Sequence, residues 1–216
     1  MADKINIIIV DDHEVVRSGI KFILSTNFNI QKIEEASNGK IFLKKLLSFK
    51  PDIVLMDISM PEMNGIEATE KALTKYPDLK IIALSMFDDE YYYQNMIDAG
   101  VKGFVLKTAS NNELKLAIEE VLNNKTYFSQ ELLNIFFKKT TSNNGYNKET
   151  AYITKRELEI LTLLCEGFTN EMIAEKLFIS PKTVKTHRTN LLKKTKSNNT
   201  VGMFLFAIKH NIIKIK

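Results

Sequence analysis

The stretch IIIVDDHEVV, residues 7–16, decides how the N-terminal half of this chain folds. Four apolar residues typical of a buried strand run directly into two adjacent carboxylates, Asp11 and Asp12. Acids often follow strands and begin helices, because the N-terminus of a helix stabilises negative charge. That explanation would suffice if no later residue were expected to lie beside the two acids. The rest of the sequence places further polar residues at the ends of other predicted strands.

Five apolar runs alternate with amphipathic stretches in the first part of the chain. The runs cover residues 5–10, 30–36, 52–56, 79–84 and 103–106. Between them, apolar residues recur at helical spacing, as in the series Leu114, Ala117, Ile118 and Val121. Five strand-then-helix units predict an α/β doubly wound sheet of five parallel strands with helices on both faces. In such sheets, binding sites form outside the carboxyl ends of the strands.

The second part of the chain shows no strand alternation and predicts a small all-α domain of four helices. TKRE (154–157) is a capping box, and it predicts a helix that ends near Gly167. A short second helix follows, and ISPKTV then gives Ser180 as the N-cap of a third, with Pro181 at its first position. A fourth helix is expected from about Asn199.

Charge is distributed unevenly between the two parts. Residues 1–130 carry 15 Lys and Arg against 19 Asp and Glu, whereas residues 131–216 carry 15 against 7. This asymmetry suggests an acidic module joined to a basic one that binds a polyanion. The polar segment KKTTSNNGYNKET (138–150) predicts a flexible linker, and the stretch SQELLNIFFKK before it has a helical pattern. We expect the first module at 1–125, a helical and polar linker at 126–151 and the basic module at 152–216. A solvated basic face is the alternative. No apolar run is long enough to span a bilayer and no signal-peptide pattern is present, so a cytoplasmic protein without membrane contact is expected.

The ends of the other predicted strands carry polar and charged residues that are expected to lie beside Asp11 and Asp12. The third strand leads to Asp57, the fourth ends at Ser85 and the fifth ends at Lys107. Because the carboxyl ends of parallel strands meet at one edge of the sheet, three carboxylates, a hydroxyl and an ammonium group are expected to converge. Two carboxylates about 4 Å apart repel by about 4 kcal/mol at an effective dielectric of about 20, so such a group requires a cation.

Hard oxygen ligands at one edge of a sheet suit Mg²⁺, which keeps several waters and takes few carboxylates from the protein. We expect Asp12 to bind it directly and Asp11 through water, with Asp57 and the backbone carbonyl of Ser59 as further ligands. Lys107 supplies a second positive charge. This pocket is suited to phosphoryl transfer onto Asp57, which stands alone on the central strand. The chain is then a self-catalysed phosphoacceptor with slow autodephosphorylation, and not an enzyme that turns over a substrate.

Each of these assignments has a plainer alternative. Asp57 taken alone is a strand-end acid, and only the joint pattern argues otherwise. His13 is a formal third metal ligand, but Mg²⁺ avoids imidazole, so we expect His13 to be exposed in the first turn of the helix. The stretch DDEYYYQNM (88–96) is expected to form a mobile or partner-facing surface, because three consecutive tyrosines cannot all be buried on one helix face.

The pieces IIVDDH, PDIVLMDISMPEMNGIEA, IIALS and AGVKGFVLK resemble the receiver domain of two-component response regulators, over about residues 3–125. The resemblance implies a flavodoxin-like fold in which a sensor histidine kinase phosphorylates Asp57. It also implies that Ser85 turns inward to bond the phosphoryl group and that the aromatic Phe104 swings with it. A plain core role is the alternative for Phe104, as for most aromatic residues on strands.

The second and third helices of the basic module, joined at LFIS (177–180), form a helix-turn-helix pattern. In that motif the third helix lies in the major groove of double-stranded DNA, and residues near its start reach base edges. Basic side chains are spread along this helix and just beyond it, at Lys182, Lys185, Arg188, Lys193, Lys194 and Lys196. A basic amphipathic helix can also bind a membrane surface or an acidic protein, which the turn pattern disfavours.

Residues 152–213 resemble the LuxR-type DNA-binding domain of the NarL/FixJ family, through ITKRELEILTLLCEGFTNEMIAEKLFISPKTVKTHRTNLLKK and AIKHNII. By that resemblance, the base-reading positions are Lys185, Thr186 and Thr189. The candidates for DNA-backbone contact are Lys182, Thr183, Arg188 and Asn190, and basic residues later in the helix, such as Lys193, mostly meet phosphate.

The last helix of that family usually forms a homodimer, expected here when the chain is phosphorylated or bound to DNA. The residues for it are Val201, Phe204, Leu205 and Ile208, although the same stripe could simply close the core. The chain departs from the family pattern at Met172, Thr195, Ser197 and Thr200. These departures put in doubt how firmly the last helix packs and which DNA sequence is bound.

Together these resemblances imply a transcription factor controlled by phosphorylation, and two alternatives remain. The first is an aspartyl-phosphate hydrolase, which needs a second catalytic acid after the nucleophile, where Ile58 and Ser59 stand. The second is a DNA-binding protein that is indifferent to phosphorylation and uses its first module only to dimerise.

Overall fold

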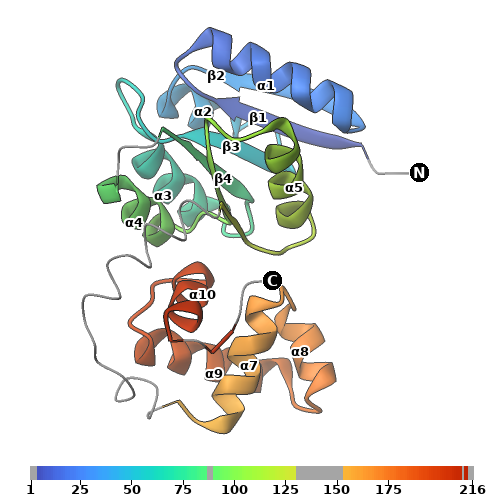
Figure 1. Ribbon diagram of the computed structural model, residues 1–216, viewed down its shortest axis with the longest axis vertical. Coiled ribbons are helices and arrows are strands. Elements are labelled where there is room, and N and C mark those ends of the chain that lie inside the picture. The colour runs from blue at the N-terminus through green and yellow to red at the C-terminus, as the bar shows by residue number, and fades with distance from the viewer. Residues whose placement is uncertain (1–3, 87–89, 130–152, 211, 214–216) are drawn as a thin grey trace. The chain divides into compact units, whose positions relative to one another are not determined.

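A computed structural model describes residues 4–86, 90–129, 153–210 and 212–213 of the chain (Figure 1). Within these ranges, six strands and nine helices form two compact units. The first unit contains the described residues up to 122 and residues 127–129, and the second contains residues 123–126 and the described residues from 153 on. Most of the predicted linker lies outside the described residues. No helix in the described ranges is long and apolar enough to cross a membrane.

The first unit is built on a parallel sheet whose strand order is β2-β1-β3-β4-β5-β6. The chain enters the sheet at β1, places β2 on one side of it and then continues with β3 on the other. This reversal brings the carboxyl ends of β1 and β3 side by side, at the position where doubly wound sheets form their sites. The strands are β1 (Ile5–Val10), β2 (Ile30–Ala36), β3 (Ile53–Asp57), β4 (Ile81–Ser85), β5 (Gly103–Leu106) and β6 (Tyr127–Phe128).

The prediction of a five-stranded sheet is wrong, because β6 adds a sixth strand along the edge of β5. Tyr127 pairs with Gly103 and Phe128 with Phe104, in parallel register. The backbone N–H of Ser129 then donates to the carbonyl of Phe104 at 3.3 Å. A two-residue strand is too short to show the alternation by which strands are recognised in a sequence. Only its backbone pairing defines it.

Helices cover both faces of the sheet, with α1 and α5 on one face and α2, α3 and α4 on the other (Figure 1). Alternate strand residues point to opposite faces, so Ile7 and Ile9 enter the core beneath α1 and α5. The predicted helical spacing of apolar residues on α5 is confirmed, because all four side chains lie in this core: Leu114, Ala117, Ile118 and Val121. The helices are α1 (Glu14–Asn27), α2 (Gly39–Lys45), α3 (Gly65–Lys75), α4 (Glu90–Ala99) and α5 (Asn111–Leu122).

The second unit consists of α7 (Lys155–Cys165), α8 (Asn170–Lys176), α9 (Pro181–Lys194) and α10 (Thr200–Lys209). The N-caps predicted at Thr154 and Ser180 are confirmed, and each accepts a hydrogen bond from the first turn of its helix. The four helices enclose one apolar core, whose buried members are Ile160, Leu161, Leu163, Leu164, Ile173, Ala174, Val184, Leu191, Met203 and Ala207.

An ion pair between Glu157 and Lys194 lies beside the core of this second unit. The Glu157 carboxylate, 3% exposed, completes the capping box by accepting from the backbone N–H of Thr154 at 2.8 Å. The same carboxylate also accepts from the Lys194 ammonium group at 2.6 Å. The end of α9 is therefore joined to the start of α7 by a charged hydrogen bond, the stronger kind in protein interiors.

Two of the departures from the family pattern form the turn between α9 and α10. The Thr195 hydroxyl is buried and donates to the Leu191 carbonyl at 2.8 Å, and it lies 2.9 Å from the Ser197 hydroxyl. A Cβ added at Gly202 would lie only 3.0 Å from Cβ of Ser197. A small residue at each of these two positions lets α10 approach the turn closely, and α10 places Met203 in the core.

A tight contact beneath the sheet edge generates the first prediction. A Cβ on Gly65 would lie 2.0 Å from the carbonyl oxygen of Asp57, so we expect Gly65→Ala to lower the free energy of unfolding by about 3 kcal/mol. The matched control is Gly19→Ala, because nothing lies within 4 Å of a Cβ at this mid-helix position. That variant should gain about 0.5–1 kcal/mol. Urea unfolding of the full chain, followed by circular dichroism, measures both, and a Gly65→Ala variant as stable as wild type would contradict the contact.

Candidate functional site

The carboxyl ends of β1, β3 and β5 bring together two carboxylates and an ammonium group. The Lys107 ammonium nitrogen lies 2.7 Å from Oδ2 of Asp11 and 2.9 Å from Oδ2 of Asp57. Asp11 and Asp57 are buried, and only a tenth of the Lys107 side chain is exposed. The structure therefore brings together three of the residues predicted to form the site. We call these residues, with Asp12, the carboxylate pocket.

Asp12 and His13 form the open side of this pocket. The Asp12 side chain is 30% exposed, and its Oδ1 lies 2.8 Å from Nδ1 of His13. The same ring nitrogen lies 3.3 Å from Oδ1 of Asp11, which also accepts from the backbone N–H of His13 at 2.8 Å. His13 is exposed, as predicted, but it is the N-cap of α1 and its ring contacts both acids. The imidazole therefore belongs to the surroundings of the pocket.

The protonation of the pocket follows from its burial. Burial raises the pKa of the Asp57 carboxyl above its ordinary value, and the neighbouring Asp11 carboxylate adds to the rise, while the hydrogen bond from Lys107 opposes it. Burial acts to lower the pKa of Lys107, but its hydrogen bonds to Asp11 and Asp57 outweigh that effect and raise it. The ammonium group therefore remains charged, while ionising Asp57 costs free energy.

The donor set in the pocket fits a divalent cation. One potential ligand atom from each of Asp11, Asp12, His13 and Asp57 lies within 4.8 Å of the others. Three of these residues offer carboxylate oxygens, the ligands that Mg²⁺ prefers. Ser59 is exposed and lies two residues beyond Asp57, in the loop that precedes α3. Further positive charge would relieve the repulsion that the carboxylates retain beside Lys107.

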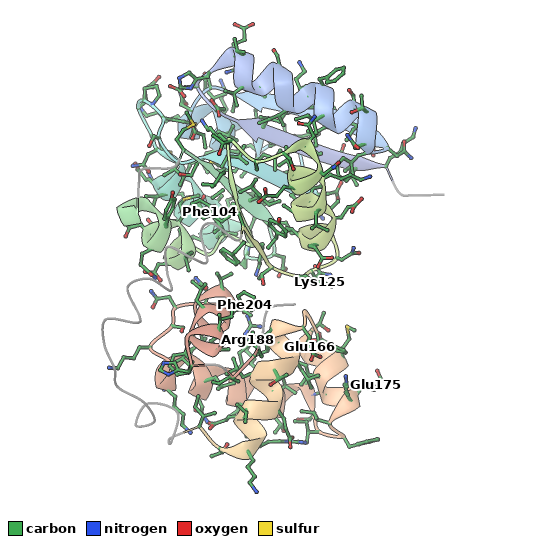
Figure 2. The ribbon with its side chains drawn as sticks, in the orientation of Figure 1. Phe104, Lys125, Glu166, Glu175, Arg188 and Phe204 are labelled. Atoms are coloured by element: carbon green, nitrogen blue, oxygen red, sulfur yellow. The ribbon has the colours of Figure 1, made fainter. Side chains whose placement is uncertain are left out.

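Ser85 is the last residue of β4, and Phe104 lies on the neighbouring strand β5, where it pairs with Ala83; both Ser85 and Phe104 are buried. The Ser85 hydroxyl donates to the carbonyl of Met86 at 2.9 Å. Phe104, labelled in Figure 2, lies edge-on to the ring of Tyr93, with the ring centroids 4.9 Å apart. Burial alone is compatible with both interpretations of Phe104, as a mobile aromatic residue or as plain core.

Tyr93 is the residue of this region that the sequence analysis missed. It lies on α4 and is fully buried, whereas the stretch that contains it was predicted to be a mobile or partner-facing surface. Met96 and Ile97 on the same helix are fully buried as well. The spacing i, i+3, i+4 of these three residues is the ordinary pattern of a buried helix face, and it was available in the sequence.

Seven of the eight predicted DNA-binding residues are exposed on α9, on the side away from Val184 and Leu191, which lie in the core. The exposed residues are Lys182, Thr183, Lys185, Thr186, Thr189, Asn190 and Lys193. One side of α9 is therefore basic and polar, while its other side packs in the core. Such a helix suits a polyanion whose groove is wide enough to admit it.

Arg188, labelled in Figure 2, differs from those seven residues. It is half-buried, and its guanidinium donates to the hydroxyl of Thr200 at 2.6 Å. Burial lowers its pKa below the ordinary value for arginine. Thr200 is the first residue of α10, so this bond connects α9 with α10 at one of the positions where the chain departs from the family pattern.

The predicted dimer residues lie on a face of α10 that the core cluster does not include. That cluster takes Met203 and Ala207 from α10. Val201 and Ile208 are buried, and Phe204 and Leu205 are half-buried. The remaining departure, Met172, lies on α8 with about half of its surface exposed.

The raised pKa of Asp57 predicts how stability changes with pH when no divalent ion is present. The folded form favours protonated Asp57, so wild type loses stability as the pH rises from the unfolded-state pKa to the higher folded-state pKa. Asp57→Asn does not titrate, so its stability relative to wild type should increase over that interval and then level off. Urea unfolding between about pH 4 and pH 8 measures this difference. A pH-independent difference would show that burial does not control the Asp57 carboxyl.

Comparison with known proteins agrees with this geometry. Residues 7–119 match the response regulator receiver domain, and residues 151–207 match the bacterial regulatory proteins of the luxR family. The chain is 38% identical over 216 residues to the oxygen regulatory protein NreC of Staphylococcus aureus (strain JH9), and the match covers 96% of this chain and 99% of NreC.

Solved structures of similar proteins include the response regulator ChrA of a heme-sensing two-component system. ChrA is 29% identical, with a TM-score of 0.53, and the match covers 97% of this chain and 99% of ChrA. A LuxR-family two-component response regulator from Aurantimonas sp. SI85-9A1 is 26% identical, with a TM-score of 0.61, over 64% of this chain and 99% of that one. The resemblance seen in the sequence is confirmed: this chain belongs to the two-component response regulators of the NarL/FixJ family, which join a receiver domain to a LuxR-type DNA-binding domain and regulate transcription.

Proposed function

We propose that Asp57 accepts a phosphoryl group from a sensor histidine kinase and that this modification controls binding of the chain to double-stranded DNA. One observation carries the proposal. Asp57 is a buried carboxylate at the end of a central strand, held 2.9 Å from an ammonium group that also pairs with Asp11. A carboxylate placed in this way faces positive charge on the side where the phosphoryl oxygens would lie.

In the proposed reaction, a carboxylate oxygen of Asp57 attacks the phosphorus atom of the donor. The new P–O bond forms as the P–N bond to the kinase histidine breaks, and the imidazole leaves with the electron pair. Lys107, which holds Asp57 in the unmodified chain, would then pair with an oxygen of the transferred group. Asp11, Asp12, Asp57 and the Ser59 carbonyl would hold Mg²⁺, which would supply further positive charge to the pocket when bound. Slow attack of water on the phosphorus would reverse the modification.

The phosphoryl group adds about one unit of negative charge at the edge of the sheet. Ser85 now donates to the Met86 carbonyl, so it must turn to donate to the phosphoryl group instead. We propose that Phe104 changes its packing together with this turn. Couplings between two such sites are typically about 1–3 kcal/mol, which is enough to change the affinity of a second site severalfold.

The exposed face of α9 is the proposed DNA-binding surface, with its base-reading residues near the start of the helix. We propose that the stripe on α10, defined by Val201, Phe204, Leu205 and Ile208, joins two chains, so that the homodimer binds two half-sites. The receiver would occupy 1–125 together with the short strand β6, the linker the rest of 126–151, and the DNA-binding domain 152–216. A protein that binds chromosomal DNA and a kinase would act in the cytoplasm.

The proposal predicts which aspartate is labelled. Acetyl phosphate with Mg²⁺ should phosphorylate the wild-type chain, and Asp57→Asn should abolish labelling because the nucleophile is lost. Asp78→Asn is the matched control, since Asp78 is an exposed acid in the loop before β4, and it should be labelled like wild type. Removing the divalent ion with a chelator should also suppress labelling of wild type. Intact-mass spectrometry measures all of these samples, and labelled Asp57→Asn would refute the proposed phosphoacceptor.

A further prediction separates DNA binding from folding on α9. Lys185→Ala should weaken binding to a DNA site selected by the wild-type chain by about 1–3 kcal/mol, with no loss of stability, because Lys185 is exposed. Arg188→Ala should lower the free energy of unfolding by about 1 kcal/mol, because it removes the bond to Thr200. Thr200→Val removes the same bond and is the matched variant. If Lys185→Ala and Arg188→Ala changed the DNA affinity equally and the free energy of unfolding equally, the separation of DNA binding from folding would be contradicted.

A further inference from the structure

The carbonyl of Met86 is an acceptor for two hydroxyl groups. Ser85 donates to it at 2.9 Å, and Tyr93, seven residues farther along the chain, donates to it at 3.3 Å. The Met86 side chain contributes little to this arrangement, since 63% of the residue is exposed. The backbone of this residue, immediately after β4, is therefore the point where the proposed switch hydroxyl meets α4.

Tyr93 connects this carbonyl to β5. Its ring is fully buried and lies edge-on to Phe104, at an interplanar angle of 88° and with 4.9 Å between the ring centroids. Edge-to-face pairs at this distance are a favoured arrangement of aromatic rings. The Tyr93 side chain thus contacts Phe104 with its ring and the Met86 carbonyl with its hydroxyl. It therefore links α4 to Phe104 directly and to Ser85 through the carbonyl that the two hydroxyls share.

We propose that Tyr93 is a positioning residue of the phosphorylation switch: its hydroxyl keeps the Met86 carbonyl hydrogen-bonded while Ser85 turns from that carbonyl to the phosphoryl group on Asp57. This inference rests on the proposed function of the carboxylate pocket. Phe104 has no hydroxyl, so it cannot donate to this carbonyl itself. Phe104, on β5, is therefore connected to the hydrogen bonds at the end of β4 through its contact with Tyr93.

The energetic argument concerns the acceptor that Ser85 leaves behind. A carbonyl that loses a donor without a replacement is destabilised, particularly where water has limited access. Both hydrogen bonds to Met86 are partly buried. With Tyr93 present, the carbonyl keeps one donor after Ser85 has turned. Among the hydrogen bonds of the described residues, only these two hydroxyls donate to that carbonyl, so without the Tyr93 hydroxyl the turn of Ser85 removes its remaining donor there and disfavours the phosphorylated arrangement.

Tyr93→Phe tests this role because it removes the hydroxyl and retains the ring. The probe is the beryllium trifluoride anion with Mg²⁺, a mimic of the aspartyl phosphate, and its affinity for the full chain is measured by isothermal titration calorimetry. We expect Tyr93→Phe to weaken binding roughly three- to tenfold, the range for one hydrogen bond. The matched control is Tyr76→Phe, since the Tyr76 hydroxyl also donates at 3.3 Å, to the carbonyl of Leu46, and this change should leave the affinity unaltered.

A double-mutant cycle with Ser85→Ala distinguishes positioning from general destabilisation. Ser85→Ala should weaken binding by itself, and adding Tyr93→Phe to it should have no further effect, because no hydroxyl is left to turn. A Tyr93→Phe variant that binds like wild type, or whose effect persists unchanged in the Ser85→Ala background, would overturn the role proposed for Tyr93. A wild-type chain that fails to bind the probe with Mg²⁺ would instead refute the proposed function of Asp57.

Discussion

The ion pairs of Lys107 with Asp11 and Asp57 are the interaction on which the rest of the receiver depends. Three adjacent parallel strands, β1, β3 and β4, and their neighbour β5 all direct their carboxyl ends to this edge, so their polar residues are forced together by the topology. Two buried carboxylates at one site are tolerated because the ammonium group lies within 2.9 Å of both. Burial, together with the neighbouring Asp11 carboxylate, raises the pKa of Asp57, and the closeness of the two carboxylates makes the pocket a good acceptor of further positive charge, which links the fold to its proposed chemistry.

The backbone around the pocket is fixed as tightly as its charges. Gly65 begins α3 where its N–H donates to the carbonyl of Ile58 at 2.8 Å and where a side chain would collide with Asp57. The loop that follows Asp57 is thereby held against the strand that carries it. In the second unit, the corresponding constraint is the buried carboxylate of Glu157, which caps α7 and pairs with Lys194 at the end of α9. Each unit therefore combines an apolar core with ion pairs beside it, those of Lys107 in the first and that of Glu157 with Lys194 in the second.

Much of this architecture was predictable because it depends on local chemistry. Apolar runs followed by polar residues located the strand ends and hence the pocket, and Thr154 and Ser180 located two helix starts through their capping preference. The rest depends on contacts between distant residues. The strand β6 is defined only by its pairing with β5, and the half-buried state of Arg188 depends on Thr200, twelve residues later. Tyr93 was missed for a different reason, since a run of three tyrosines obscured an ordinary buried spacing.

The short strand β6 has a consequence for the strand that carries Phe104. Phe128 pairs with Phe104, and the N–H of Ser129 donates to the Phe104 carbonyl, so residues 128 and 129 lie along the edge of the strand that carries this aromatic residue. The strand that carries Phe104 is therefore paired on both sides, with β4 through Ala83 and with β6 through Phe128. A change in the packing of Phe104 thus acts on a backbone that hydrogen bonds hold from two directions.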